Sequence, residues 1–70
     1  MPNPTFAQVK ATAQRAGYTR RVIVEMDASD LYGWIKPNPD FEGTFTLIDD
    51  ETGKVLNVNG WLVNVRDLDD

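Results

Sequence analysis

The sequence predicts a mainly β protein in which an N-terminal helix precedes a five-stranded, strongly bent antiparallel sheet that forms a small barrel. Apolar residues recur at helical spacing only near the N-terminus. From residue 19 to residue 66 they occur instead in five short runs, with turn-forming residues at the breaks. Five such runs are typical of a small barrel, because a flat sheet would leave too many apolar side chains exposed.

The helix is expected over about residues 5–16. Thr5 and Gln8 fit a capping box, in which each side chain accepts a hydrogen bond from the backbone N–H of the other residue. Asn3, followed by a proline, is a competing cap. Gly17 can adopt the left-handed conformation that ends a helix. The apolar stripe of the helix comprises Phe6, Val9, Ala13 and Ala16. This stripe is short, so the helix needs a surface to lie on.

The strands are expected over residues 21–26, 31–36, 44–49, 55–58 and 61–66. Gly33 carries no side chain, so another part of the chain can approach the second strand closely at that point. Asn59 and Gly60 are typical of a tight turn, because both residues tolerate positive φ. Two prolines place residues 37–40 in a loop. Residues 67–70 form an acidic end.

Length and composition limit the chemistry that this chain can perform. A chain of 70 residues is one domain and buries only about 60% of its unfolded surface. It has no cysteine and no histidine, which excludes disulfides, thiolate and imidazole metal sites, and His-based catalysis. We therefore predict no cofactor, no metal and no catalytic residue. Association with copies of itself remains as a way to complete the core.

Hydropathy predicts no membrane partner. No stretch approaches the ~18 apolar residues of a membrane span, and the N-terminus lacks the apolar core of a signal peptide. Together with the absence of cysteine, this indicates a cytoplasmic protein.

Charge is unevenly distributed along the sequence. The formal net charge is −4. Residues 1–24 carry +4, whereas residues 25–70 carry three basic and eleven acidic side chains, a net −8. The basic side chains of the first segment are Lys10, Arg15, Arg20 and Arg21. They could form a patch for nucleic acid, or they could be solvated charges at the ends of the helix and first strand.

Two short motifs accompany the order of elements. Gly33, Asp40 and the apolar run at residues 45–50 form the first, and residues 58–60 form the second, with further valines following. Over about residues 5–66 the chain thereby resembles the Sm/LSm-like family of small β-barrels, which includes a bacterial RNA chaperone. The resemblance implies one Sm-like domain that assembles with copies of itself into a ring and binds uridine-rich RNA in its pore.

The resemblance also implies the residues of two sites. The ring seam would join the fourth strand of one subunit to the fifth strand of the next, through Val55, Leu56, Val58, Trp61, Leu62, Val63 and Val65. RNA would contact the loop before the third strand and the turn before the fifth, at Asp40, Phe41, Thr44, Asn59 and Gly60. Asn59 stands where the family has Arg, Thr44 where it has Asn, and Glu42 at the base-stacking position. A carboxylate there disfavours RNA, because most RNA affinity comes from cations that contact phosphate.

Several residues allow two interpretations. Tyr32 and Trp34 could be stacking platforms or interface anchors, or they could form a second small core under the helix. Trp61 could belong to an interface or core, or to a ligand site. The acidic run at residues 49–51 could bind calcium or be a solvated turn. Asp27 and Asp30 could act as an acid–base pair or could simply flank a turn.

The sequence as a whole predicts a non-enzymatic binding module that forms a homo-oligomeric ring and binds RNA. The alternative is an acidic protein–protein interaction module, or a phage-type inhibitor, that binds a basic protein partner and no nucleic acid.

Overall fold

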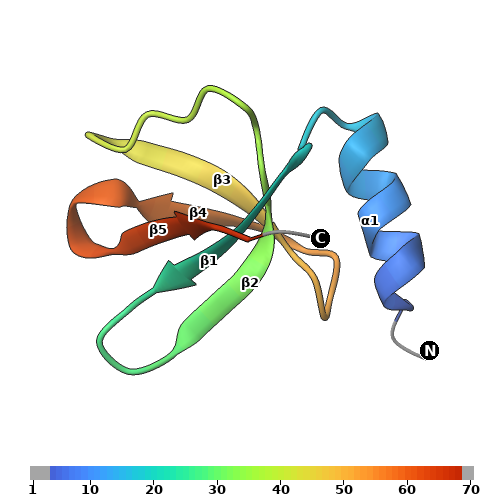
Figure 1. Cartoon of the computed structure of the whole chain (residues 1–70), viewed down its shortest axis with the longest axis horizontal. Helices are drawn as coiled ribbons and strands as arrows, with labels where there is room; N and C mark the ends of the chain where they lie inside the picture. The colour runs from blue at the N-terminus through green and yellow to red at the C-terminus, as the bar shows by residue number, and fades with distance from the viewer. Residues whose placement is uncertain (1–3, 69–70) are drawn as a thin grey trace.

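The computed structural model describes residues 4–68 as one N-terminal helix followed by a five-stranded antiparallel sheet (Figure 1). The elements are α1 (Phe6–Arg15), β1 (Arg20–Glu25), β2 (Asp30–Ile35), β3 (Thr44–Asp49), β4 (Val55–Asn59), a 3₁₀ turn η1 (Gly60–Leu62) and β5 (Asn64–Asp67). The predicted helix and five strands are therefore present. The predicted acidic end begins inside β5, and its residues 69 and 70 lie outside the described part of the chain.

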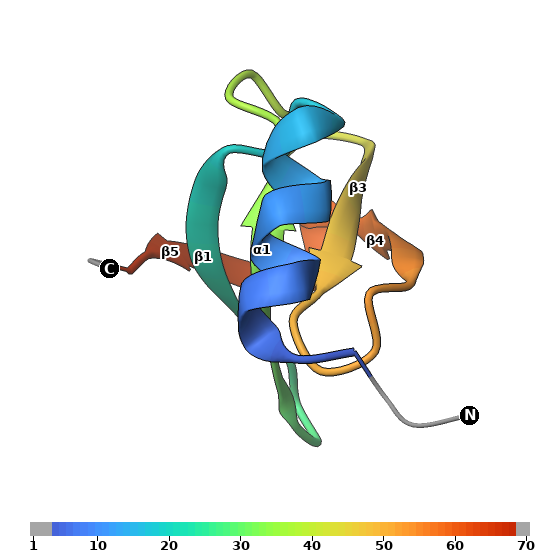
Figure 2. The same cartoon turned by 90° about the vertical axis from the view of Figure 1, so that its right-hand side faces the viewer.

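The predicted five-stranded antiparallel sheet is present, but it is not closed into a barrel. The strand order is β4-β3-β2-β1-β5, which puts β4 and β5 at opposite edges of the sheet. Each of these two strands pairs with one neighbour only, β4 with β3 and β5 with β1. The two strands are adjacent in sequence, but η1 carries the chain from one edge to the other and they do not form a hairpin (Figure 2).

The fifth strand begins later than predicted. The sequence predicts it over residues 61–66, but the strand starts at Asn64 and Trp61 lies in η1. The Asn59 side chain accepts a hydrogen bond of 3.0 Å from the Trp61 backbone N–H. This bond caps a 3₁₀ turn in place of a tight hairpin turn.

The inner face of the curved sheet holds the main core. Its buried residues come from β1, β2, β3 and β4: Val22, Val24, Ile35, Phe45, Leu47 and Val58. Gly33 of β2 lies on this face, two residues before the buried Ile35. A Cβ atom there would come closer than 3.0 Å to the carbonyl oxygen of Ile48 in β3. The absence of a side chain at this position thus allows the backbones of β2 and β3 to approach each other.

Helix α1 lies across the outer face of the sheet (Figure 2). Val9 and Ala13 pack there with Tyr18, Trp34 and Ile48 in a second buried cluster. The interpretation of Trp34 as core is therefore confirmed, since only 1% of its surface is exposed. Tyr32, two residues before Trp34 in β2, is 44% exposed and lies outside that cluster.

The capping box predicted at the start of the helix and the glycine predicted at its end are both present. The Thr5 N–H donates to Gln8 Oε1 at 2.9 Å and the Gln8 N–H donates to Thr5 Oγ1 at 3.2 Å, which completes the capping box. The competing cap, Asn3, lies outside the described residues. Gly17 follows the helix with φ of 91°, a conformation that glycine adopts without strain.

We predict that Gly33→Ala lowers the free energy of unfolding by about 3 kcal/mol, because the new Cβ must displace backbone. Gly17→Ala is the control. There a Cβ atom would meet nothing within 4 Å, so only the positive φ costs stability, roughly 1–2 kcal/mol. Urea unfolding of the two variants measures both effects. A loss for Gly33→Ala no larger than that for Gly17→Ala would contradict the close approach of β2 and β3.

Candidate binding surfaces

The β2–β3 loop and η1 are joined by backbone and side-chain hydrogen bonds. The Gly60 N–H donates to the carbonyl of Gly43 at 2.8 Å, and the Trp61 indole N–H donates to the carbonyl of Glu42. Thr44 and Asn59 face each other in the β3–β4 register. The fold therefore brings together the five residues that the resemblance placed at an RNA site in this region: Asp40, Phe41, Thr44, Asn59 and Gly60.

The conformation of this loop is fixed by Asp40 and by Gly60. Asp40 Oδ1 accepts a hydrogen bond of 3.0 Å from the Glu42 N–H, and the Asp40 carbonyl accepts one of 3.2 Å from the Gly43 N–H. Such an Asx turn is a common use of aspartate in loops. At Gly60 a Cβ atom would come closer than 3.0 Å to the backbone of Phe41, so the two segments touch only because this residue is glycine.

The aromatic side chains of this region are accessible. Trp61 is 73% exposed although its N–H is bonded, and Phe41 is 36% exposed. The Phe41 and Phe45 rings pack perpendicular to each other, with 5.4 Å between their centroids. The Arg20 guanidinium carbon lies 5.7 Å from the centroid of the Phe41 ring. The packing thus orients both exposed rings.

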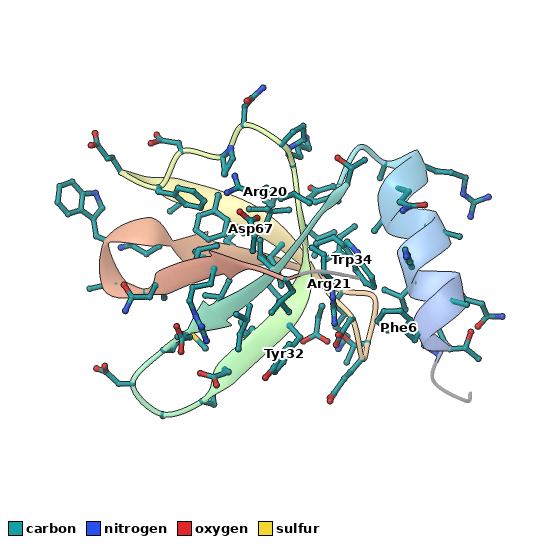
Figure 3. The ribbon with its side chains drawn as sticks, in the orientation of Figure 1. Phe6, Arg20, Arg21, Tyr32, Trp34 and Asp67 are labelled. Atoms are coloured by element: carbon teal, nitrogen blue, oxygen red, sulfur yellow. The ribbon has the colours of Figure 1, made fainter. Side chains whose placement is uncertain are left out.

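The predicted basic residues lie on α1 and β1, and Arg20 and Arg21 on β1 pair with carboxylates. Arg20 donates to Asp67 through Nε at 2.6 Å and Nη2 at 3.1 Å (Figure 3). This hydrogen-bonded pair raises the pKa of Arg20 and lowers the pKa of the Asp67 carboxyl. Lys10 and Arg15 lie on α1. The pairing of Arg20 with a residue 47 positions away had no signal in the sequence.

Arg21 is part of the packing between the helix and the sheet. Its Nη2 lies 2.8 Å from Asp50 Oδ2, and both side chains are only 14% exposed. Its guanidinium carbon lies 4.8 Å from the centroid of Trp34, which faces it across the β1–β2 pair, and 5.2 Å from that of Phe6 (Figure 3). Cation–π contacts of this kind are strongest where water is excluded. Because Arg21 contacts Phe6 of α1 as well as Trp34 of β2, it stabilises the packing of α1 against the sheet.

The residues predicted for a seam between subunits divide between the surface and the core. Val55 in β4 is 56% exposed, and Leu62 in η1 is 73% exposed, as is Trp61. Val58 is buried in the inner core. The other three predicted residues are partly buried and pack against that core: Leu56, Val63 and Val65.

An apolar groove opens beside η1. It has a volume of about 540 Å³ and lies between the β1–β2 turn and the β4–η1 segment. Its apolar lining comprises Met26, Ala28, Leu31, Leu56, Val58, Leu62 and Val63, and its polar lining comprises Asp27, Ser29, Asn57 and Asn59. The volume falls in the range of ligand sites. We call this feature the η1 groove.

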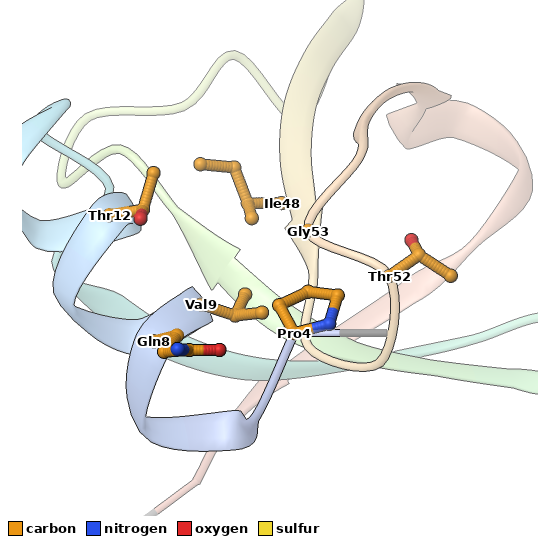
Figure 4. A pocket seen from close by; sticks show the side chains of 7 residues that line it. All are labelled: Pro4, Gln8, Val9, Thr12, Ile48, Thr52 and Gly53. Atoms are coloured by element: carbon orange, nitrogen blue, oxygen red, sulfur yellow. The ribbon is translucent and has the colours of Figure 1, made fainter. Parts of the chain in front are cut away.

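A smaller hollow lies where the start of α1 meets the β3–β4 turn (Figure 4). Its volume is about 190 Å³. Val9 and Ile48 on its wall also belong to the cluster under the helix. The hollow is therefore a gap at the margin of that packing.

The acidic run at residues 49–51 is a turn capped by its own first carboxylate. Asp49 Oδ1 accepts hydrogen bonds from the N–H groups of Glu51, at 2.7 Å, and Thr52, at 3.2 Å. Asp27 and Asp30 lie at the β1–β2 turn and are exposed. Within residues 4–68, no group of three or more acidic side chains is placed to hold a metal ion.

No helix in the described part of the chain is both long and apolar enough to cross a bilayer.

In comparisons with known proteins, no protein-family model, curated protein or solved structure is significantly similar to this chain.

We predict that the Asp67 carboxyl titrates below the ordinary aspartate range in the folded protein, and that Arg20→Gln returns its midpoint toward that range. The lowered pKa means that the pair stabilises the fold above the ordinary aspartate pKa. This contribution is lost as the pH falls through the lowered value. A carbon-detected NMR titration of the carboxyl measures the midpoint. Lys54→Gln, at an exposed position outside this pair, is the control, and an unchanged midpoint in Arg20→Gln would contradict the pairing.

Proposed function

We propose that this chain is a non-enzymatic, Sm-like module that assembles with copies of itself into a ring, with the β4 edge of one copy paired to the β5 edge of the next. The observation that carries the proposal is the strand order, which leaves one side of β4 and one side of β5 without a partner strand in the described chain. Free edges present unpaired N–H and C=O groups to another strand.

The arrangement of the two edges favours a ring over a simple dimer. The edges differ in sequence and lie at opposite ends of one sheet, so pairing β4 with β5 is head-to-tail. Head-to-tail contacts generate rings when the rotation closes. The order of a helix and five antiparallel strands supports the same reading, because it agrees with the family that the sequence resembles.

Apolar exposure at the β4 edge also supports assembly. Val55 on β4 presents more than half of its surface to water. A chain of 70 residues has a small core for its surface. Covering this side chain with a neighbouring copy would add about 25 cal/mol for each Å² of apolar area buried.

RNA is a second candidate ligand, and the convergence of Asp40, Phe41, Thr44, Asn59 and Gly60 supports it. The electrostatics support it less. Arg20 forms a salt bridge with Asp67, and Arg21 forms one with Asp50. These two guanidinium groups are therefore less available to contact phosphate. Binding of an oligouridine that weakens steeply as salt rises, and that Phe41→Ala abolishes while Tyr32→Ala does not, would establish this function. Tyr32 is a suitable control because it is a comparably exposed aromatic residue on another surface.

Light scattering tests the assembly directly. We expect a mass several times the 7.9 kDa of one chain at micromolar concentrations. A strict monomer over this range would overturn the proposal.

Val55→Lys tests whether β4 forms the seam. Lysine on an edge strand opposes pairing with another strand, and Val55 is exposed enough to change without disturbing the core. We expect the Val55→Lys assembly to dissociate at protein concentrations at least tenfold higher than those at which the assembly of the natural chain dissociates. Ala11→Lys adds the same charge on the exposed side of α1 and should leave the mass unchanged. Equal masses for the two variants would show that β4 is not the seam.

A further inference from the structure

The surface formed by η1 and the turn that it touches is aromatic and unusually accessible. Trp61 and Leu62 are each 73% exposed. Leu62 lines the η1 groove, so the groove begins at the residue that follows the exposed tryptophan in the chain. A large aromatic side chain that stays in water while a groove lies beside it is typical of an interaction surface.

The Trp61 ring is fixed before any partner arrives. Its N–H is bonded to the carbonyl of Glu42, its backbone N–H is capped by the Asn59 side chain at 3.0 Å, and Gly60 is bonded to Gly43 at 2.8 Å. A side chain held in this way loses little conformational entropy on binding. The accessible faces of the indole are thus preorganised for contact.

The charge around the indole has one sign. The segments at residues 40–44 and 57–64 contain Asp40 and Glu42 and no basic residue, and both carboxylates lie on exposed residues. The only charged residue that lines the η1 groove is Asp27. The nearby guanidinium of Arg20 is bonded to Asp67. A π face next to unneutralised carboxylates attracts a cation and repels phosphate.

We propose that this surface binds a protein segment in which arginine alternates with large apolar residues. The arginine stacks on Trp61 and pairs with Glu42, and the neighbouring apolar side chain enters the η1 groove. Arginine suits the site because its planar guanidinium stacks on aromatic rings while it donates to a carboxylate. This inference does not depend on the ring, because every residue that it uses belongs to one copy.

A capped eight-residue peptide of alternating leucine and arginine tests the proposal, with a peptide that has glutamate in place of arginine as its control. We expect the arginine peptide to bind at least tenfold more tightly than the glutamate peptide, as measured by fluorescence anisotropy. Trp61→Ala should weaken binding at least tenfold. Trp61→Phe keeps a π face and should retain binding within about threefold, which separates loss of the ring from loss of the fold.

Matched variants separate the site from general attraction to an acidic protein. Glu42→Gln should weaken binding about threefold, whereas Glu51→Gln, which removes an exposed carboxylate from another turn, should have no effect. Tyr32→Ala removes an exposed aromatic ring elsewhere and should also have no effect. Val55→Lys should bind the peptide within twofold of the natural chain, so that failure of assembly and failure of this site give different results.

Three outcomes would overturn the proposal. The first is equal binding of the arginine peptide by Trp61→Ala and the natural chain. The second is preferential binding of an oligouridine that is lost in Trp61→Ala, which would assign the surface to RNA. The third is a lower assembled mass for Trp61→Ala without peptide binding by the natural chain, which would make the surface a contact between copies.

Discussion

The backbone contact between Gly60 and the loop at residues 41–43 organises both the sheet and the candidate surface. Only glycine permits this approach, because a Cβ atom would overlap the Phe41 backbone. The contact holds the chain in a 3₁₀ turn at the point where a hairpin turn would have returned it beside β4. The chain crosses instead to the other edge of the sheet and pairs with β1. An open sheet and an exposed indole thus follow from one close approach.

The outer face depends on a different interaction. Arg21 is enclosed by Phe6 from the helix and Trp34 from β2, and Asp50 neutralises it. A partly buried ion pair has a large desolvation cost, which the aromatic contacts and a well-placed carboxylate offset. In the sequence, Arg21 has the pattern of an exposed charged residue. In the structure it is part of the packing between the helix and the sheet. The positive charge of the N-terminal segment is correspondingly less available to a ligand than its formal +4 indicates.

Local signals in the sequence predicted the local features of the fold. The capping box at Thr5 and the end of the helix at Gly17 each depend on residues within one turn, and the close approach at Gly33 depends on the missing side chain of a single residue. The departures arise from contacts between distant residues. Trp61 was predicted as a strand residue because the apolar alternation includes it, but its partner is a loop nearly twenty residues earlier. The carboxylate partners of Arg20 and Arg21 are even more distant in sequence, so spacing alone could not show that these arginines are paired.

The charge of the two free edges bears on assembly of an acidic chain. Copies with a net charge of −4 repel one another, and the repulsion is greatest where like charges are closest. β4, Val55–Asn59, contains no charged residue. β5 contains Arg66 and Asp67, which pair within their own chain with Glu25 and Arg20. Both edges are thus electrically neutral, so pairing them does not place like charges together. The negative charge lies instead on exposed turns and loops such as those of Asp27, Glu42 and Glu51, outside both edge strands.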